Sequence, residues 1–240
     1  MKQLFTITLG ALFFFGANAQ SDKNKEKNLD FGIKFGAVSN KITDISQTLV
    51  SESYYSGYTL NDNFAWGFTG SIFINYKLEE TVAAIYSEIS YCRLGNKLRY
   101  NDVYNLNYDF DTKYDYINWE LFYKVYIYRG LHTSLGGRLG FNLTPNNIFY
   151  TSNKEALYGP DIRMQQQMRD VLKGRANFSL GIGIGYEFEF GLNFDIRYYN
   201  GFSDVMETEV NNYHFIENKN LSRSFQFTMG YTLPYIFNFH

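Results

Sequence analysis

The segment from Phe178 to Phe188 constrains the fold more than any other part of the chain. Its sequence, FSLGIGIGYEF, has a large apolar residue at every second position. Strict alternation places one class of residue on each face of a β-strand. The second face carries Ser179, Gly181, Gly183, Gly185 and Glu187. Glycine weakens a strand, and a water-exposed face usually carries larger polar residues. Small residues with an occasional charge therefore indicate the narrow interior of a small closed barrel.

The amino-terminal residues have the three regions of a secretory signal peptide. Lys2 supplies a positive charge, residues 4–15 are largely apolar, and Ala17-Asn18-Ala19 is a small-residue cleavage signal. The apolar stretch is too short to span a membrane. We expect a signal peptide at residues 1–19, a short periplasmic leader at 20–28 and one barrel domain at 29–240. The signal peptide would carry the chain through the inner membrane.

The composition fits a barrel in a membrane. The chain contains 22 Tyr and 23 Phe, yet its mean hydropathy is −0.32. No later segment approaches the 18 or more continuous apolar residues of a spanning helix. A membrane barrel explains both the high aromatic content and the low mean hydropathy. Only alternate residues of its strands face lipid, and aromatic rings concentrate at the two membrane interfaces. The net charge of −2 gives no electrostatic reason to expect nucleic acid binding.

Eight segments with alternating apolar residues are predicted as strands: 29–38, 64–76, 81–94, 114–127, 131–143, 178–188, 192–199 and 221–233. The connections between them alternate between long and short, and the long ones are 39–63, 95–113, 144–175 and 200–220. Outer-membrane barrels have short periplasmic turns and longer extracellular loops. We therefore expect an all-β fold, an eight-stranded antiparallel up-and-down transmembrane barrel. The alternative fold is a soluble lipocalin-like barrel.

Several segments, taken in order, resemble the PorT-like outer-membrane β-barrel family. They are Ala17–Gln20, Phe31–Ala37, Ser87–Gly95, Gly136–Gly140, Arg197-Tyr198 and Ser224–Tyr231. The chain departs from the family at Glu120, where a proline is common, and in its longer tail from Thr232 to His240. The resemblance implies an eight-stranded barrel of mostly undefined role. The namesake of the family belongs to a protein-secretion machine.

Charged residues of both signs occupy inward positions of the predicted strands. An eight-stranded barrel is only wide enough for side chains to fill, and a buried charge requires a partner. We predict a structural cluster that fills the lumen, formed by Glu88, Glu120, Arg138, Glu187, Asp195 and Arg197. Asp30, Lys34 and Lys124 are also assigned inward. The alternative is an ion path or a proton-linked gate, which a narrow lumen without a continuous water column disfavours.

Catalytic and metal-binding patterns are weak in this sequence. An enzyme at the barrel rim needs a His near a Ser or a carboxylate. Only His214, with Ser203, Glu209 and Glu217 nearby in sequence, is placed for this role, and these residues define no triad. Three scattered His and the single Cys92 give no metal-ligand spacing. We expect no catalytic, cofactor or metal site.

The third long connection contains one helical pattern. Met164, Met168, Val171 and Leu172 recur at helical spacing between Gly159-Pro160 and Gly174. We favour a short helix that caps the barrel mouth over a Met-rich docking face for a partner or lipid.

These patterns predict an outer-membrane barrel with a structural or interaction role and no catalysis. Its expected partners are outer-membrane lipid and a protein bound through the extracellular loops, and the barrel is expected to be a monomer. The alternatives are a component of a protein-secretion machine, a narrow channel, and a rim enzyme acting on lipid or peptide.

Overall fold

The computed structural model describes residues 28–45, 58–102, 107–153, 162, 166, 169–170, 172–207 and 219–233. The predicted signal peptide and residues 20–27 of the leader lie outside this part. So do Met164, Met168 and Val171 of the predicted loop helix, and His214.

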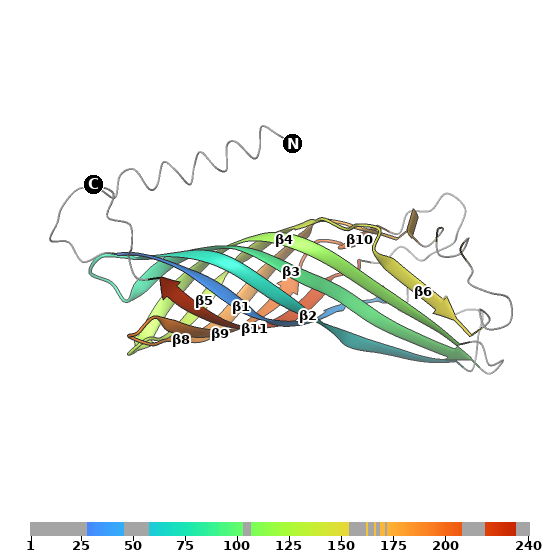
Figure 1. Ribbon diagram of the computed structural model, residues 1–240, viewed down its shortest axis with the longest axis horizontal. Coiled ribbons are helices and arrows are strands. Elements are labelled where there is room, and N and C mark those ends of the chain that lie inside the picture. Colours follow the sequence, from blue (N-terminus) through green and yellow to red (C-terminus); the bar gives the residue numbers. More distant parts are fainter. Residues whose placement is uncertain are drawn as a thin grey trace, which may run out of the picture.

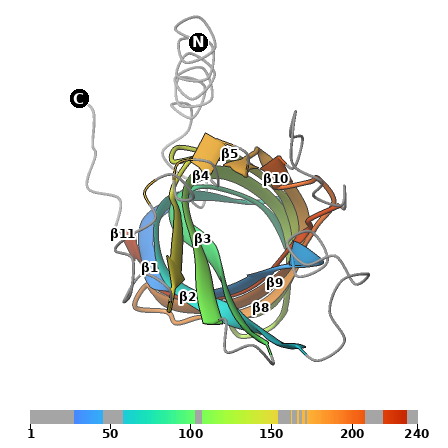
Figure 2. The ribbon, with the colours of Figure 1, turned by 90° about the vertical axis from the view of Figure 1, so that its right-hand side faces the viewer.

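Eight long antiparallel strands form a closed ring, as Figures 1 and 2 show. Their bounds are β1 Leu29–Ile42, β2 Tyr58–Lys77, β3 Ala83–Asp102, β4 Asn107–Tyr128, β5 Leu131–Asn142, β8 Asn177–Glu187, β9 Leu192–Gly201 and β11 Ser222–Leu233. Each strand pairs with its neighbours in the sequence, and β1 pairs with β11 to close the ring. This arrangement confirms the predicted all-β, eight-stranded, up-and-down fold.

Three short connections lie at one end of the ring, which we call the turn end. They join β2 to β3, β4 to β5 and β8 to β9. Arg129 and Gly130 make the second connection with φ values of 39° and 87°. Both values are positive, as a type I′ hairpin turn requires. The strand ends at Leu29 and Leu233 also lie here. We call the opposite side the extended end.

The prediction of long polar loops at the extended end is partly wrong. β1 continues to Ile42, β2 already begins at Tyr58, and β3 and β4 run on to Asp102 and from Asn107. Inside the third long connection, β6 (Ile148–Ser152) pairs with residues 108–112 of β4. Residues 58–64 of β2, 96–102 of β3, 107–112 of β4 and β6 thus form a four-stranded sheet beyond the ring, which we call the extension (Figure 1).

A second, two-stranded sheet lies at the same end. It pairs β7 (Lys173–Gly174) with β10 (Met206–Glu207). These short strands belong to the third and fourth long connections, which had been expected to be loops. They fasten these two connections to each other.

The polarity of the two strand faces reverses where the strands leave the ring. In the ring, β3 has Ile89 exposed and Glu88 and Ser90 buried. In the extension, Lys97 and Arg99 are exposed and Leu98 is buried. The alternation continues, but the exposed class changes from apolar to charged. This change is expected where the surroundings change from lipid to water, because the side of the sheet away from water must then be apolar.

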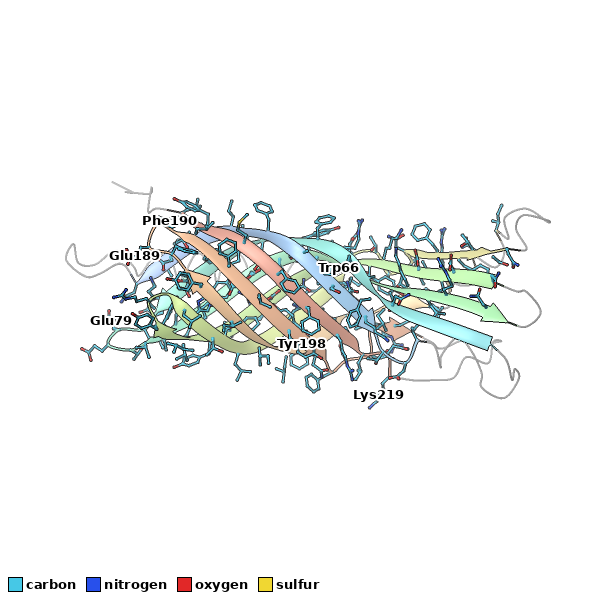
Figure 3. All side chains as sticks on the ribbon, turned by 90° about the horizontal axis from the view of Figure 1, so that it is seen from below. Trp66, Glu79, Glu189, Phe190, Tyr198 and Lys219 are labelled. Atoms are coloured by element: carbon cyan, nitrogen blue, oxygen red, sulfur yellow. The ribbon has the colours of Figure 1, made fainter. Side chains whose placement is uncertain are left out.

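The outer surface of the ring is a largely apolar belt. Figure 3 shows its side chains standing away from the strands. The exposed members include Phe35, Phe68, Ile72, Trp119, Leu121, Leu135, Ile182, Ile184, Ile196, Phe227 and Met229. Ser87 interrupts the belt on β3, but its Oγ accepts a hydrogen bond of 3.1 Å from Nε1 of Trp119. The belt therefore carries no unpaired polar group at this position.

The described residues contain no helix that is both long and apolar enough to cross a membrane.

Candidate functional site

The glycines of β8 form one wall of the barrel interior. A Cβ atom at Gly183 would lie 2.7 Å from Oγ of Ser134 and 2.9 Å from Cγ of Arg197. At Gly185 it would lie 2.6 Å from Oδ1 of Asp195 and from Nε2 of His132. These glycines leave room for the larger side chains of the neighbouring strands, so the interior is as narrow as the alternation indicates.

Two arginines and two glutamates from four strands form the middle of the interior. Nε of Arg138 lies 3.1 Å from Oε1 of Glu120. NH1 of Arg197 lies 2.8 Å from Oε2 of Glu88 and 3.2 Å from Oε2 of Glu120. The hydroxyls of Ser90 and Tyr199 also donate to Glu120, and Arg138 donates to the side-chain oxygen of Gln226. The carboxylate of Glu120 is therefore shared by four donors.

A second group of charges lies nearer the turn end. Asp195 pairs with the ammonium of Lys34, and its Oδ1 lies 3.0 Å from Nε2 of His132. Glu187 binds Nζ of Lys124 at 2.8 Å and the hydroxyl of Tyr126 at 2.9 Å. Arg197 links the two groups, because its NH2 lies 3.8 Å from Oδ1 of Asp195.

The structure brings all six predicted lumen residues into this network. Its cations are Lys34, Lys124, Arg138 and Arg197, and its carboxylates are Glu88, Glu120, Glu187 and Asp195. The charges balance, as a poorly hydrated interior requires. Asp30 does not belong to the network, because it pairs with the exposed Lys77 at 3.0 Å.

The prediction included neither Tyr199 nor the contact between His132 and Asp195. Tyr199 lies at an inward position of β9, and the alternation through Asn193, Asp195 and Arg197 could have identified it. The contact between His132 and Asp195 joins residues from β5 and β9. No signal in the sequence indicates this contact, because periodicity gives the face of a residue and not its partner across the lumen.

A packed apolar cluster closes the interior at the extended end. Its members are Val38, Ile42, Ile45, Cys92, Leu94, Leu98, Phe110, Tyr114, Tyr116, Ile148, Leu172, Val205 and Met206. Leu172 is the one member of the predicted helical pattern that the structure describes, and it is fully buried here. We call this cluster the mouth core. It separates the charged interior from the surface of the extended end.

The described candidates for catalysis are already engaged. His132 is fully buried, and Nε2 contacts Asp195 while Nδ1 lies 3.3 Å from the carbonyl oxygen of Gly130. Oγ of Ser203 accepts a hydrogen bond from the amide of Phe178 at 2.7 Å and donates to the carbonyl of Ala176. His214, Glu209 and Glu217 lie outside the described residues. Within the described residues, no three His, Cys, Asp or Glu side chains come together as metal ligands.

The outer face of the extension carries a hollow of about 280 Å³. Asn63, Lys97, Asp111 and Phe149 are register partners across its four strands. Arg99, Asp109 and Thr151 form the next row, and Nε of Arg99 donates to Oδ1 of Asp109 at 2.8 Å. This hydrogen bond and the negative charge of Asp109 raise the pKa of the Arg99 guanidinium above its usual value.

A closed ring of eight antiparallel strands with an apolar belt and a filled polar interior is the architecture of membrane-spanning β-barrels. Residues 18–207 match the sequence model of the outer membrane protein beta-barrel domain. The match covers well over half of the chain, and the chain belongs to this family. No curated protein matches the sequence.

Several solved structures of outer-membrane proteins are similar to this chain. Neisserial surface protein A shares 12% identity, with 86% of this chain and 100% of that chain covered and a TM-score of 0.40. Ail of Yersinia pestis, solved with the heparin analogue sucrose octasulfate, shares 13% over 86% and 100% of the two chains, with a TM-score of 0.38. OprG from Pseudomonas aeruginosa shares 11% over 88% and 99%, with a TM-score of 0.44.

Proposed function

We propose that this outer-membrane barrel has a structural or interaction role, carried out by the surface of its extended end. The observation that carries the proposal is the closed interior. A balanced charge network fills the lumen, and the mouth core separates it from the extended end. A barrel with a filled interior has no channel through which a solute could pass, so a partner can bind only at its outer surface. Its expected partners are outer-membrane lipid around the belt and a protein at the extended end, and the barrel would act as a monomer.

The proposed orientation places the turn end in the periplasm and the extension outside the cell. Two features support it: the predicted signal peptide at residues 1–19 and the short connections at the end where β1 begins and β11 ends. A chain delivered from the periplasm leaves its short turns on that side. The charged outer face of the extension also fits water rather than lipid.

The channel alternative is tested by conductance. We expect purified protein in a planar bilayer to show no large steady pore, because Glu120, Arg138 and Arg197 cross the lumen and the mouth core contains no charged residue. A variant with the mouth core weakened, Leu98→Asp, should still show none, since the charge network remains. A stable conductance of porin size in the wild-type protein would overturn the proposal.

We also propose that the barrel has no catalytic activity. The engaged nitrogens of His132 support this, because neither is available to activate a nucleophile. Incubation of the refolded protein with lipid and peptide ester substrates should give no hydrolysis above that of a His132→Gln variant. Turnover that depends on His214 would instead support the rim enzyme.

Within its family, we propose that the chain belongs to the PorT-like group. The segments that carry the resemblance coincide with the charge network: Glu88 lies in Ser87–Gly95, Arg138 in Gly136–Gly140, and Arg197 in Arg197-Tyr198. A role in a secretion machine is the finer alternative. Crosslinking from position 151 in intact cells tests it, because a secretion component should be captured with other secretion proteins and an independent barrel should not.

A further inference from the structure

The outer face of the extension, beyond the ring, carries a trough. The hollow lined by Asn63, Lys97 and Asp111 continues into a second hollow of about 420 Å³. Arg99, Asp109 and Thr151 line both. We propose that this trough binds an uncharged, hydroxyl-rich glycan chain. The inference rests on the proposed function only for the outward orientation of the extension.

The lining has the hydrogen-bonding character that sugar hydroxyls require. A hydroxyl group both donates and accepts, so a site for several hydroxyls needs donors and acceptors side by side. Lys97 and Arg99 of β3 supply donors, and Asp111 and Asp109 directly opposite on β4 supply acceptors. Asn63 and Thr151 on the flanking strands can serve as either.

The residues that line the two hollows carry no net charge, and the cations Lys113 and Arg169, which contact the Phe149 ring, are not among them. Lys97 and Arg99 are balanced by Asp109 and Asp111, and Arg99 is paired with Asp109 at 2.8 Å. A site for a polyanion would be expected to carry an excess of cations. The balance therefore favours an uncharged polar chain over a sulfated glycan or a nucleic acid.

Phe149 is an apolar exception on this polar face. It is 40% exposed and lines the first hollow together with the buried Leu98, whereas the neighbouring outward positions of the extension carry charged, amide or hydroxyl side chains. Nζ of Lys113 lies 4.9 Å and Cζ of Arg169 lies 5.9 Å from the centroid of the ring, so two cations contact it. A ring exposed among polar groups suits the apolar C–H face of a sugar, because both surfaces are removed from water when they meet.

The trough is built on strands rather than on loops. Neighbouring strands lie about 4.8 Å apart, so the side chains of one row stand at regular intervals across the sheet. Each of the rows is fixed by the β2–β3, β3–β4 and β4–β6 pairings. A site on paired strands loses little conformational freedom on binding, which favours a defined ligand over an adaptable surface.

The test is glycan binding by the full chain refolded in detergent micelles. An array of uncharged glycans and of sulfated or uronic acid glycans is screened, and the affinity for the best uncharged oligosaccharide is then measured by titration. We expect binding of uncharged glycans that persists at 0.5 M salt. Phe149→Ala and Asp109→Asn should each weaken it by about tenfold or more, a loss typical of one removed contact.

Phe190→Ala is the matched control. Phe190 is an exposed phenylalanine in the turn between β8 and β9, at the opposite end of the barrel (Figure 3). Its loss should leave glycan binding unchanged. Heat-modifiable migration on gels confirms that each variant is folded. If Phe149→Ala does not fold, Thr151→Arg replaces it, because a long side chain at this surface position fills the trough without touching the mouth core.

Three outcomes would overturn the glycan site: no uncharged glycan binds, only acidic glycans bind and salt abolishes their binding, or binding is unaffected by Phe149→Ala and Thr151→Arg. These outcomes leave the proposed orientation intact. Conversely, glycan binding by the purified protein together with a periplasmic location of the extension would retain the site and reject the orientation.

Discussion

At the scale of single residues, the interior depends on a fit between the glycines of β8 and the charged side chains opposite them. Alternation in the sequence was sufficient to assign Glu120 and Arg138 inward. Together with the narrow lumen, alternation also placed Arg197 in the lumen cluster with them, but it could not show that Tyr199 would reach the carboxylate of Glu120 from β9. Such contacts depend on the tilt of the strands and the diameter of the ring, which no local pattern determines.

The glycine positions can be tested with one substitution on each face. Gly185→Ala should destabilise the barrel by about 1–3 kcal/mol, because its Cβ would lie 2.6 Å from Asp195, His132 and a backbone oxygen. Gly137→Ala is the control on the outer face, where the nearest atom to a Cβ is 3.9 Å away. It should change the unfolding free energy by less than about 0.5 kcal/mol. Urea unfolding in detergent measures both, and equal effects would contradict the inward placement of Gly185.

The central ion pair gives a second residue-scale prediction. Arg138→Ala leaves Glu120 and Glu88 sharing only Arg197 in a buried space. Removing one partner of a buried pair costs about 3–5 kcal/mol. Adding Glu120→Gln restores the balance of one cation and one carboxylate, so the double variant should be at least about 1 kcal/mol more stable than Arg138→Ala.

Urea unfolding of the refolded barrel also measures the unfolding free energies of Arg138→Ala and of the double variant. Arg223→Ala is the control, because Arg223 is an exposed arginine at an outward position of β11. It should behave as wild type. If Arg138→Ala and the double variant also matched wild type, Arg138 and Glu120 would not form a buried pair.

At the scale of elements, the strands carry two alternating patterns joined end to end. Residues 95–113 were expected to be a loop because they are rich in Asn, Asp and Tyr. They nevertheless alternate, as Lys97-Leu98-Arg99 and Asp109-Phe110-Asp111 show. The reversed polarity was therefore readable from the sequence. The pairing of β6 with β4 was not, since five residues without a strong pattern do not identify a partner strand.

The reversed pattern predicts that substitutions at two adjacent residues of β3 differ strongly in their cost to stability. Leu98→Ala should cost about 2–5 kcal/mol of local stability, because Leu98 is buried in the mouth core. Lys97→Ala should cost less than about 0.5 kcal/mol, because Lys97 is exposed. Hydrogen exchange of the amides of residues 96–102 measures the difference. Equal protection in the two variants would show that the extension has no core of its own.

At the scale of the whole molecule, the two ends of the barrel differ. The turn end has three short connections, and the extended end has the extension and the two-stranded sheet. The sequence predicted the ring, because alternation and connection length are properties of the whole chain. It also predicted which end carries the longer connections. The size and order of the extended end could not be predicted, since they depend on pairings between separate connections such as β7 with β10.

The orientation is tested by thiol labelling of intact cells. Cys92 is fully buried, so the wild-type chain should not react with a membrane-impermeant maleimide. Thr151→Cys in the extension should be labelled, whereas Glu189→Cys in the β8–β9 turn should be labelled only after the outer membrane is permeabilised. The reverse pattern would place the extension in the periplasm.

The pairing of β1 with β11 also governs the order in which this chain can be assembled. One edge of β1 can pair only after β11 has been synthesised. The paired residues run from Phe31 opposite Leu233 to Ile42 opposite Ser222. Until residue 233 has emerged, β1 and β9 both present unpaired backbone edges, and such edges invite association with other chains. Contacts between residues so distant in sequence also form slowly. We therefore expect the nascent barrel to need protection of these two edges until its final strand is in place.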